Sequence, residues 1–333
     1  MTQMLKGMAN YLESCEGIKL GENKLDFLML NVPPVCNYRC TKCFTQAYHR
    51  RPENSLSITK LKSLVDEAHE LGARVVCVLG EGEPLVDKDI YELTAYISAN
   101  NMIPLITTNG SLLTRENVDI LHSLNATIVV SLDTLEPEDY KNYCGKNTDL
   151  QLVLDNIEYA RKKYSDKIEI VNGIKAMAFA IHTTVTAMNL DQVYKIHNYC
   201  GNDIFHSVEH IAKVGEANAN PDIYGEIDEY KKCKEVCLSI MDPMVLCKTP
   251  NNQSACCLFY YGIAVGYEGE IMLDTHAVET RGHIGSVLTD SLETLVSKAN
   301  DLKSIYFNQF EGCYCLIRDD RYPEFLEILK EKF

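Results

Sequence analysis

The chain has 333 residues, a formal net charge of −15 and fourteen cysteines. This length is enough for one large domain plus a smaller one, or for two domains of medium size. The acidic balance argues against nucleic acid or an anionic membrane as a partner, because the sequence shows no basic patch that would offset the repulsion.

No segment has the features of a secretion signal or of a membrane span. The first 21 residues lack a basic stretch followed by a continuous apolar core. No run approaches the ~20 apolar residues that cross a bilayer. Many cysteines in such a chain argue against a disulfide framework and favour metal binding in a reducing compartment. We therefore expect a cytoplasmic protein without membrane association.

Apolar periodicity predicts six strands that alternate with helices after a short amphipathic lead-in over residues 1–24. The predicted strands are 25–32, 74–79, 103–107, 127–132, 168–181 and 204–211, and the predicted helices are 57–71, 88–100, 115–124, 150–164 and 190–200. This alternation is typical of an α/β fold with a parallel sheet and right-handed crossovers. Six units are fewer than the eight that close a TIM barrel, so we expect a partial barrel of TIM type.

Three cysteines follow the first predicted strand at C-x3-C-x2-C spacing: Cys36, Cys40 and Cys43, with Phe44 directly after them. Three thiolates can hold three irons of a cubane cluster, which normally takes four thiolates. The fourth iron is then open to a small chelating molecule. The pattern resembles the radical S-adenosylmethionine (radical SAM) family, in which the amino and carboxylate groups of SAM chelate that iron of a 4Fe-4S cluster. The alternatives are a zinc loop or three unrelated core thiols.

The loops after the other strands extend this resemblance, because ligands of parallel sheets bind at the carboxyl ends of the strands. Residues 80–84 read Gly-Glu-Gly-Glu-Pro and resemble the family's Gly-Gly-Glu-Pro motif, which receives the amino group of SAM. The alternative is a plain strand-to-helix turn. Ser131 and Asp133 alternate along one strand and therefore share a face. The resemblance covers about residues 25–216, agrees with a (β/α)6 partial barrel and implies SAM contacts at Gly80, Glu81, Gly82, Glu83, Pro84, Thr108, Asn109, Ser131, Asp133, His182 and Val214.

After about residue 220 the alternation stops and cysteines become frequent, which predicts a boundary near residues 216–222. We expect a radical SAM core over 25–220 and a small cysteine-rich domain over 221–333. The latter resembles the SPASM or twitch extensions, which hold auxiliary iron–sulfur clusters. The resemblance implies at least one auxiliary 4Fe-4S cluster, with Cys257, Cys313, Cys315 and one of Cys233, Cys237 or Cys247 as ligands, Cys247 being the one we select.

One position departs from the SPASM pattern. Asp274 stands where that pattern has a second cysteine, and we expect Asp274 and His276 to lie in a surface turn, with an unusual cluster ligand at Asp274 or His276 as the alternative. A zinc site built from the same thiols is the alternative to the auxiliary cluster.

The resemblance implies an oxidoreductase or epimerase that cleaves SAM reductively to a 5′-deoxyadenosyl radical, which abstracts a hydrogen from substrate. Its partners would be SAM and an electron donor such as flavodoxin or ferredoxin. An auxiliary cluster would favour substrate oxidation, whereas a thiol donor would favour epimerisation, and Cys144 is the candidate donor because it follows the fourth strand. A buried structural thiol is the alternative for Cys144.

The substrate is less constrained. Only 24 residues precede the first strand, too few for a leader-peptide recognition domain, so we expect a small molecule such as a sugar or aminocyclitol. A peptide, as in enzymes that mature peptide natural products, is the alternative. A hypothesis of another class is a non-catalytic iron–sulfur or zinc-binding protein.

Overall fold

The structure is a computed structural model that describes residues 2–9, 11–12, 22–45, 51–240, 246–248, 254–309, 315–319 and 321–332. Within these residues the main sheet has eight strands in the order β13-β12-β2-β3-β4-β5-β8-β9. All neighbouring pairs from β12 to β9 are parallel. The six predicted strands are β2 Phe27–Val32, β3 Val75–Gly80, β4 Ile103–Thr108, β5 Thr127–Ser131, β8 Phe179–Val185 and β9 Phe205–His210. The α/β partial barrel is therefore confirmed.

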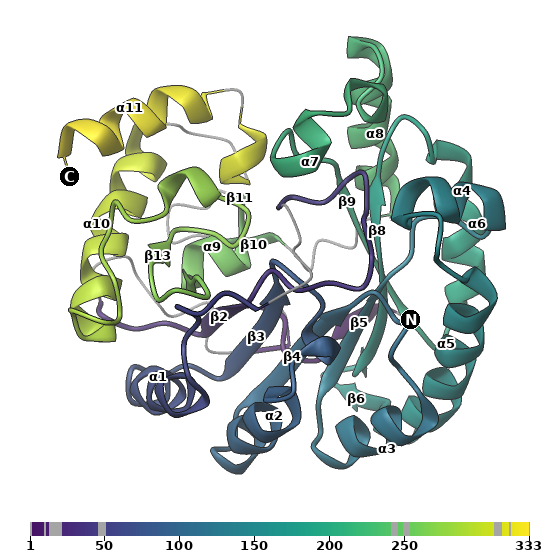
Figure 1. The fold of residues 1–333 in the computed structure, drawn as a ribbon, viewed down its shortest axis with the longest axis horizontal. Helices are drawn as coiled ribbons and strands as arrows, with labels where there is room; N and C mark the ends of the chain where they lie inside the picture. Colours follow the sequence, from purple (N-terminus) through teal and green to yellow (C-terminus); the bar gives the residue numbers. More distant parts are fainter. Residues whose placement is uncertain are drawn as a thin grey trace.

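Helices cover the outer face of this sheet (Figure 1). They are α1 Ile58–Glu70, α2 Ile90–Ala99, α3 Arg115–Ser123, α4 Pro137–Cys144, α5 Leu150–Tyr164 and α6 Leu190–Cys200. Side-chain caps fix the first residues of α1 and α5. The Ser57 hydroxyl accepts from the Lys60 amide, and the Asp149 carboxylate accepts from two amides of α5. All six residues of β2 are buried, as expected for a parallel strand covered on both faces.

The predicted strand over 168–181 is wrong in its bounds. The chain forms a hairpin, β6 Glu169–Val171 and β7 Ile174–Met177, before β8 begins. The turn is Asn172-Gly173, and both residues have positive φ, which is the signature of this tight hairpin. Strand β1, Gln3–Leu5, pairs in parallel with β7, so part of the lead-in is a strand. This N-terminal segment closes the floor of the barrel, where Leu5 and Met8 border the central cavity.

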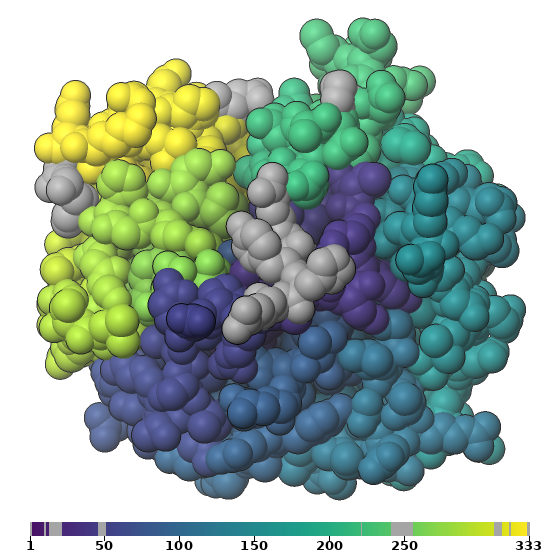
Figure 2. Space-filling model, in the orientation of Figure 1, coloured from purple at the N-terminus to yellow at the C-terminus, as the bar shows by residue number. Residues whose placement is uncertain are grey.

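The C-terminal region extends the same sheet. Strand β12, Gly262–Val265, pairs in parallel with β2, and β13, Ile271–Met272, pairs antiparallel with β12. Figure 2 shows the yellow-green residues of this region in direct contact with the blue residues of the barrel. The other elements are α7 Gly215–Asn218, α8 Ile227–Ile240, β10 Leu246–Lys248, β11 Ser254–Cys256, α9 Cys257–Tyr261, α10 Leu292–Gln309 and α11 Tyr322–Lys332. Within the described parts of the chain, no helix is long and apolar enough to cross a membrane.

Candidate active site

A cavity of about 610 Å³ opens at the carboxyl ends of the barrel strands. Its size suits a small-molecule or cofactor site. One side is bordered by the cysteine loop and the loops after β3, β4 and β5, and the other by β8, β9 and C-terminal segments. The predicted residues that line it are Cys36, Cys40, Cys43, Gly80, Glu81, Gly82, Glu83, Thr108, Asn109, Ser131, His182 and Cys315.

The backbone of the cysteine loop is held by two short helices. The C-terminal end of α4 accepts two of its amides, Arg39 N to Cys144 O at 3.0 Å and Thr41 N to Tyr143 O at 2.9 Å. On the other side, the Glu216 amide at the start of α7 donates to Cys43 O at 2.8 Å. These bonds fix where the three thiols point.

Gly215 makes this close approach possible. Its φ is +60°, and an added Cβ would lie 2.1 Å from the Phe44 carbonyl carbon. Val214, its neighbour, is buried and is not among the described residues that border the cavity. Val214 is the N-cap residue of α7, and the SAM contact expected there stays a prediction.

The three thiols are partly exposed on the cavity side of their loop. Burial raises the pKa of Cys36 to about 12 and also raises the pKa of Cys43, so metal binding at this loop must release protons. Three soft sulfur donors on one wall of a cavity fit an iron–sulfur cluster. Among the residues that the structure describes, no group of three or more Cys, His, Asp or Glu side chains is arranged to hold one metal ion.

A buried ion pair lies inside the cysteine loop. Lys42 Nζ is 2.5 Å from Asp133 Oδ2, and the other carboxylate oxygen accepts from the Thr184 amide at 2.9 Å. Burial alone would lower the pKa of Lys42, but the Asp133 carboxylate raises it, so the ammonium is kept charged. Asp133 does not border the cavity among the described residues, and here it binds the loop lysine.

The loop after β3 is packed tightly against the end of β2. An added Cβ at Gly82 would lie 2.3 Å from Val35 O, and the Glu83 amide donates to that same carbonyl at 2.8 Å. The Glu83 carboxylate accepts from Thr108 Oγ1 at 2.6 Å and from the Asn109 amide at 2.7 Å, which ties β3 to β4. Pro84 begins a short 3-10 turn and is not among the described lining residues.

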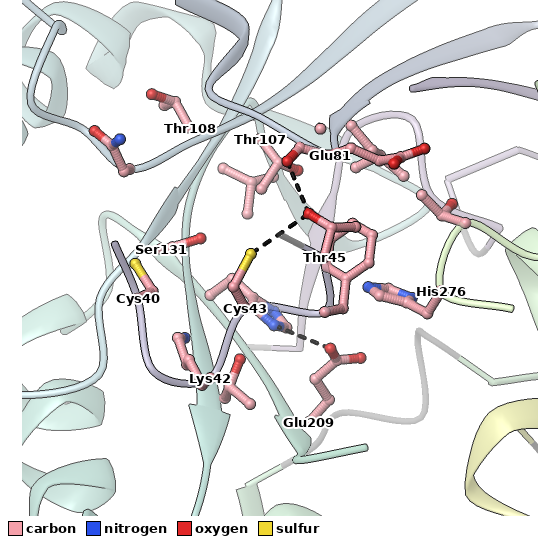
Figure 3. A pocket seen from close by; sticks show the side chains of 18 of the residues that line it. Cys40, Lys42, Cys43, Thr45, Glu81, Thr107, Thr108, Ser131, Glu209 and His276 are labelled. Carbon is pink, nitrogen blue, oxygen red and sulfur yellow. Dashed lines mark hydrogen bonds and ion pairs between the residues drawn. The ribbon is translucent and has the colours of Figure 1, made fainter. Parts of the chain in front are cut away.

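Thr45 joins the cysteine loop to this second loop. Its hydroxyl donates to Glu81 O at 2.9 Å and lies 3.6 Å from Cys43 Sγ, so Figure 3 shows Thr45 between the two. Threonine has no special place in the sequence pattern, so sequence reasoning missed this residue. Nearby, Asn109 Nδ2 lies 4.0 Å from Cys36 Sγ and donates to Asn37 Oδ1 at 2.9 Å.

The opposite wall carries charges that the sequence did not reveal. Glu209 of β9 lies 3.1 Å from Arg318 and 3.5 Å from His182. Burial opposes ionisation, but Arg318 and His182 hold the pKa of Glu209 well below its usual range. Arg318 also donates to Cys315 Sγ at 3.1 Å, so this wall links the barrel to the C-terminal region.

The expected surface turn at Asp274 is wrong. Asp274 is only 7% exposed and borders the cavity together with His276. Asp274 Oδ1 lies 3.3 Å from His276 Nδ1, and the His276 ring packs edge-on against Phe44 with centroids 4.7 Å apart. This turn therefore faces the cysteine loop across the cavity.

The C-terminal cysteines fall into three groups. Cys256 and Cys315 border the cavity, whereas Cys257 is fully buried and is not among the described residues that border it. Cys233 and Cys237 of α8 pack in an apolar cluster with residues of β8 and β9. The side chain of Cys247 and all of Cys313 lie outside the described residues.

Cys144 is the last residue of α4 and is 7% exposed. Its thiol makes a hydrogen bond with that of Cys40; this bond and burial raise the pKa of Cys40 well above its usual range. Cys144 is not among the described residues that line the cavity. It therefore lies behind the cysteine loop.

Comparison with known proteins agrees with this geometry. Residues 30–175 match the family model of the radical SAM superfamily. Fe-coproporphyrin III synthase of Methanosarcina barkeri is 34% identical over 125 residues, 37% of this chain and 31% of that protein. GTP 3′,8-cyclase of Actinobacillus pleuropneumoniae is 33% identical over 156 residues, 45% of this chain and 44% of that protein. The matches thus span less than half of these relatives.

Two solved structures share the fold. Streptococcus suis SuiB bound to its precursor peptide SuiA has a TM-score of 0.62 and 16% identity over 83% of this chain and 65% of that one. The enzyme anSMEcpe with bound AdoMet has a TM-score of 0.59 and 15% identity over 92% of this chain and 95% of that one. The likeness to anSMEcpe covers 92% of this chain, so the shared fold extends into the C-terminal region.

Proposed function

We propose that this protein binds a 4Fe-4S cluster through Cys36, Cys40 and Cys43, binds SAM beside it, and uses the pair to abstract hydrogen from a small molecule. The observation that carries this proposal is the single cavity onto which the three thiols and the loop over residues 80–83 both open. When bound, the cluster and SAM would supply a 5′-deoxyadenosyl radical. The chain itself binds SAM and the substrate, orients them toward each other and excludes water.

Several residues supply that orientation. The Lys42–Asp133 pair and Thr45 hold the cysteine loop against β5 and against the loop after β3. Leu5 and Met8 close the cavity floor with apolar side chains. Together these contacts keep the thiols and the SAM loop in a fixed relation and shield the cavity from bulk water.

We further propose an auxiliary iron–sulfur cluster beside the cavity, with Cys256 and Cys315 as two of its ligands. This differs from the sequence expectation for Cys257, whose side chain is fully buried and is not among the described residues that border the cavity. The same two positions would serve zinc, so metal analysis must decide between them.

Oxidation of substrate is favoured over epimerisation. A hydrogen donor must reach the substrate, and Cys144 lies behind the cysteine loop rather than on the cavity surface of the described residues. The Asp274–His276 pair lies on that surface and could accept a proton from a substrate hydroxyl or ammonium. Cys144→Ala should therefore still give product; loss of product with normal 5′-deoxyadenosine release would restore the epimerase hypothesis.

The cavity charges favour a small polar substrate over a nucleoside triphosphate. Five carboxylates border it, against the three cations Arg39, Lys42 and Arg318, and Lys42 and Arg318 are already paired with Asp133 and Glu209. The carboxylates are Glu81, Glu83, Glu209, Glu216 and Asp274. This balance would repel a triphosphate. A peptide substrate is the alternative, supported by the fold shared with SuiB, whose structure holds a precursor peptide.

The decisive experiment is anaerobic reconstitution with iron and sulfide, followed by reduction with dithionite or a reduced flavodoxin in the presence of SAM. Mass spectrometry should detect 5′-deoxyadenosine, with a rate that rises when the correct sugar, aminocyclitol or peptide is added. A protein that binds iron but never cleaves SAM would be an electron carrier, and one that takes up only zinc would be a structural metalloprotein.

A further inference from the structure

A charged cluster joins the SAM loop to the C-terminal region. The Glu81 carboxylate is paired with Arg281 Nη2 and also accepts from Asn31 Nδ2 at 3.4 Å. Arg281 Nε lies 3.0 Å from Glu270 Oε1, and its guanidinium stacks 5.7 Å from the Tyr267 ring. Glu81 is 5% exposed and Glu270 is 9% exposed.

This cluster has more negative than positive charge. Two buried carboxylates share one guanidinium, and neither oxygen of Glu270 has a hydrogen-bond donor among the described residues. Burial raises the pKa of both Glu81 and Glu270. A buried charge without a partner is costly, so a cation arriving from the cavity would relieve the imbalance.

Only one member of the cluster reaches the cavity. Glu81 borders it, whereas Arg281 and Glu270 are not among the described lining residues. Thr45 fixes the Glu81 carbonyl, and Arg281 and Asn31 fix its carboxylate, so this cavity-lining residue is held at both its backbone and its side chain. Arg281 and Glu270 would therefore act on a ligand through their charge and through the position of Glu81.

We propose that Glu81, Arg281 and Glu270 form an anionic clamp by which the C-terminal region sets the affinity of this loop for the ammonium group of SAM. This inference rests on the proposed function. In it, Glu81 contacts the ammonium, while Arg281 and Glu270 are positioning residues. The excess negative charge of the clamp contributes to SAM binding even though Glu270 never touches SAM.

Glu270→Gln tests this directly, because it keeps the shape of the side chain and removes the excess charge. SAM affinity, measured by equilibrium dialysis and by the SAM-dependent change in the EPR spectrum of the reduced cluster, should fall about three- to tenfold. Glu81→Gln should cost about tenfold or more, because it removes a charge-assisted bond. Glu268→Gln is the matched control: Glu268 lies two residues from Glu270, is partly exposed and accepts from Asn54.

The deamino analogue of SAM separates the clamp from a general structural effect. The affinity for this analogue should be the same in wild type, Glu270→Gln and Glu81→Gln, because the analogue lacks the ammonium group on which the clamp acts. Equal weakening of SAM and the analogue, or a Glu270→Gln affinity equal to that of Glu268→Gln, would overturn the clamp. If Glu270→Gln fails to fold, as judged by its melting temperature, Glu81→Gln decides alone. Failure of wild type to bind SAM would instead overturn the proposed function.

Discussion

The two walls of the cavity are built in different ways. On the SAM side, the wall residues come from barrel strands, mostly near their carboxyl ends, or from the loops that directly follow them, so Cys36, Glu81 and Thr108 are placed by local sequence and by the parallel sheet. On the other side, Glu209 of β9 is paired with Arg318 and shares the wall with Asp274 and Cys256. These three residues come from three separate C-terminal segments. The first wall follows from a motif. The second wall follows from how distant segments pack.

The largest expected effect concerns the first wall. Replacing Cys36, Cys40 and Cys43 together by alanine removes all three thiol ligands, so 5′-deoxyadenosine formation should fall below detection. Iron bound at the second wall should remain. The control is Cys233→Ala, which alters a thiol in the separate apolar cluster of α8 and should keep SAM cleavage. Residual 5′-deoxyadenosine from the triple variant would refute the ligand assignment.

The next effect tests the second wall. Cys256→Ser and Cys315→Ser should each lower auxiliary iron and sulfide content, because these thiols border the cavity. Cys257→Ser should retain the iron and instead lower the free energy of unfolding by about 1–3 kcal/mol, since it buries a hydroxyl in place of a thiol. Iron analysis of the three variants in the triple-alanine background is the measurement. Loss of iron from Cys257→Ser alone would restore the original sequence expectation.

Gly215→Ala should displace the cysteine loop of the first wall, although Gly215 itself lies in α7. The added Cβ would collide with the Phe44 backbone, so the cysteine loop or α7 must shift, at a cost of about 1–3 kcal/mol in the free energy of unfolding. Gly173→Ala is the matched control: its φ is also positive, +79°, but nothing lies within 4 Å of the new Cβ. Urea unfolding of both should show the larger loss at Gly215. Equal losses would mean that only backbone strain matters at this position.

The smallest expected effect is on the reduction potential of the first-wall cluster. Lys42→Met leaves the Asp133 carboxylate uncompensated and should lower the potential, whereas Asp133→Asn leaves the ammonium and should raise it. Each shift should be on the order of 50 mV. An EPR-monitored redox titration measures both. Shifts of the same sign would show that these variants act by moving the loop and not by their charge.

The residues of the first wall could be predicted from the sequence because each motif there lies within a few consecutive residues after a strand. Strand periodicity placed β2 to β5, and the spacing of Cys36, Cys40 and Cys43 placed three thiols on one loop, all of which reach the cavity. Sequence could not separate Cys256 from Cys257, since adjacent residues at the start of a helix point in different directions and only packing decides which one faces the cavity. It also missed Asp274, because a polar residue after a short strand is usually exposed and here the barrel covers it.

The pairing of β12 with β2 has a consequence for how the chain is made. Strand β2 is synthesised early, yet one of its edges stays unpaired until residues 262–265 have emerged from the ribosome. At about 5–20 residues per second this interval is on the order of 10–50 s. During it a strand of mostly apolar residues offers free amides and carbonyls, which is the condition under which nascent chains associate edge to edge. A nascent chain stopped before β12 would keep that edge open, and we expect it to need a chaperone or to aggregate.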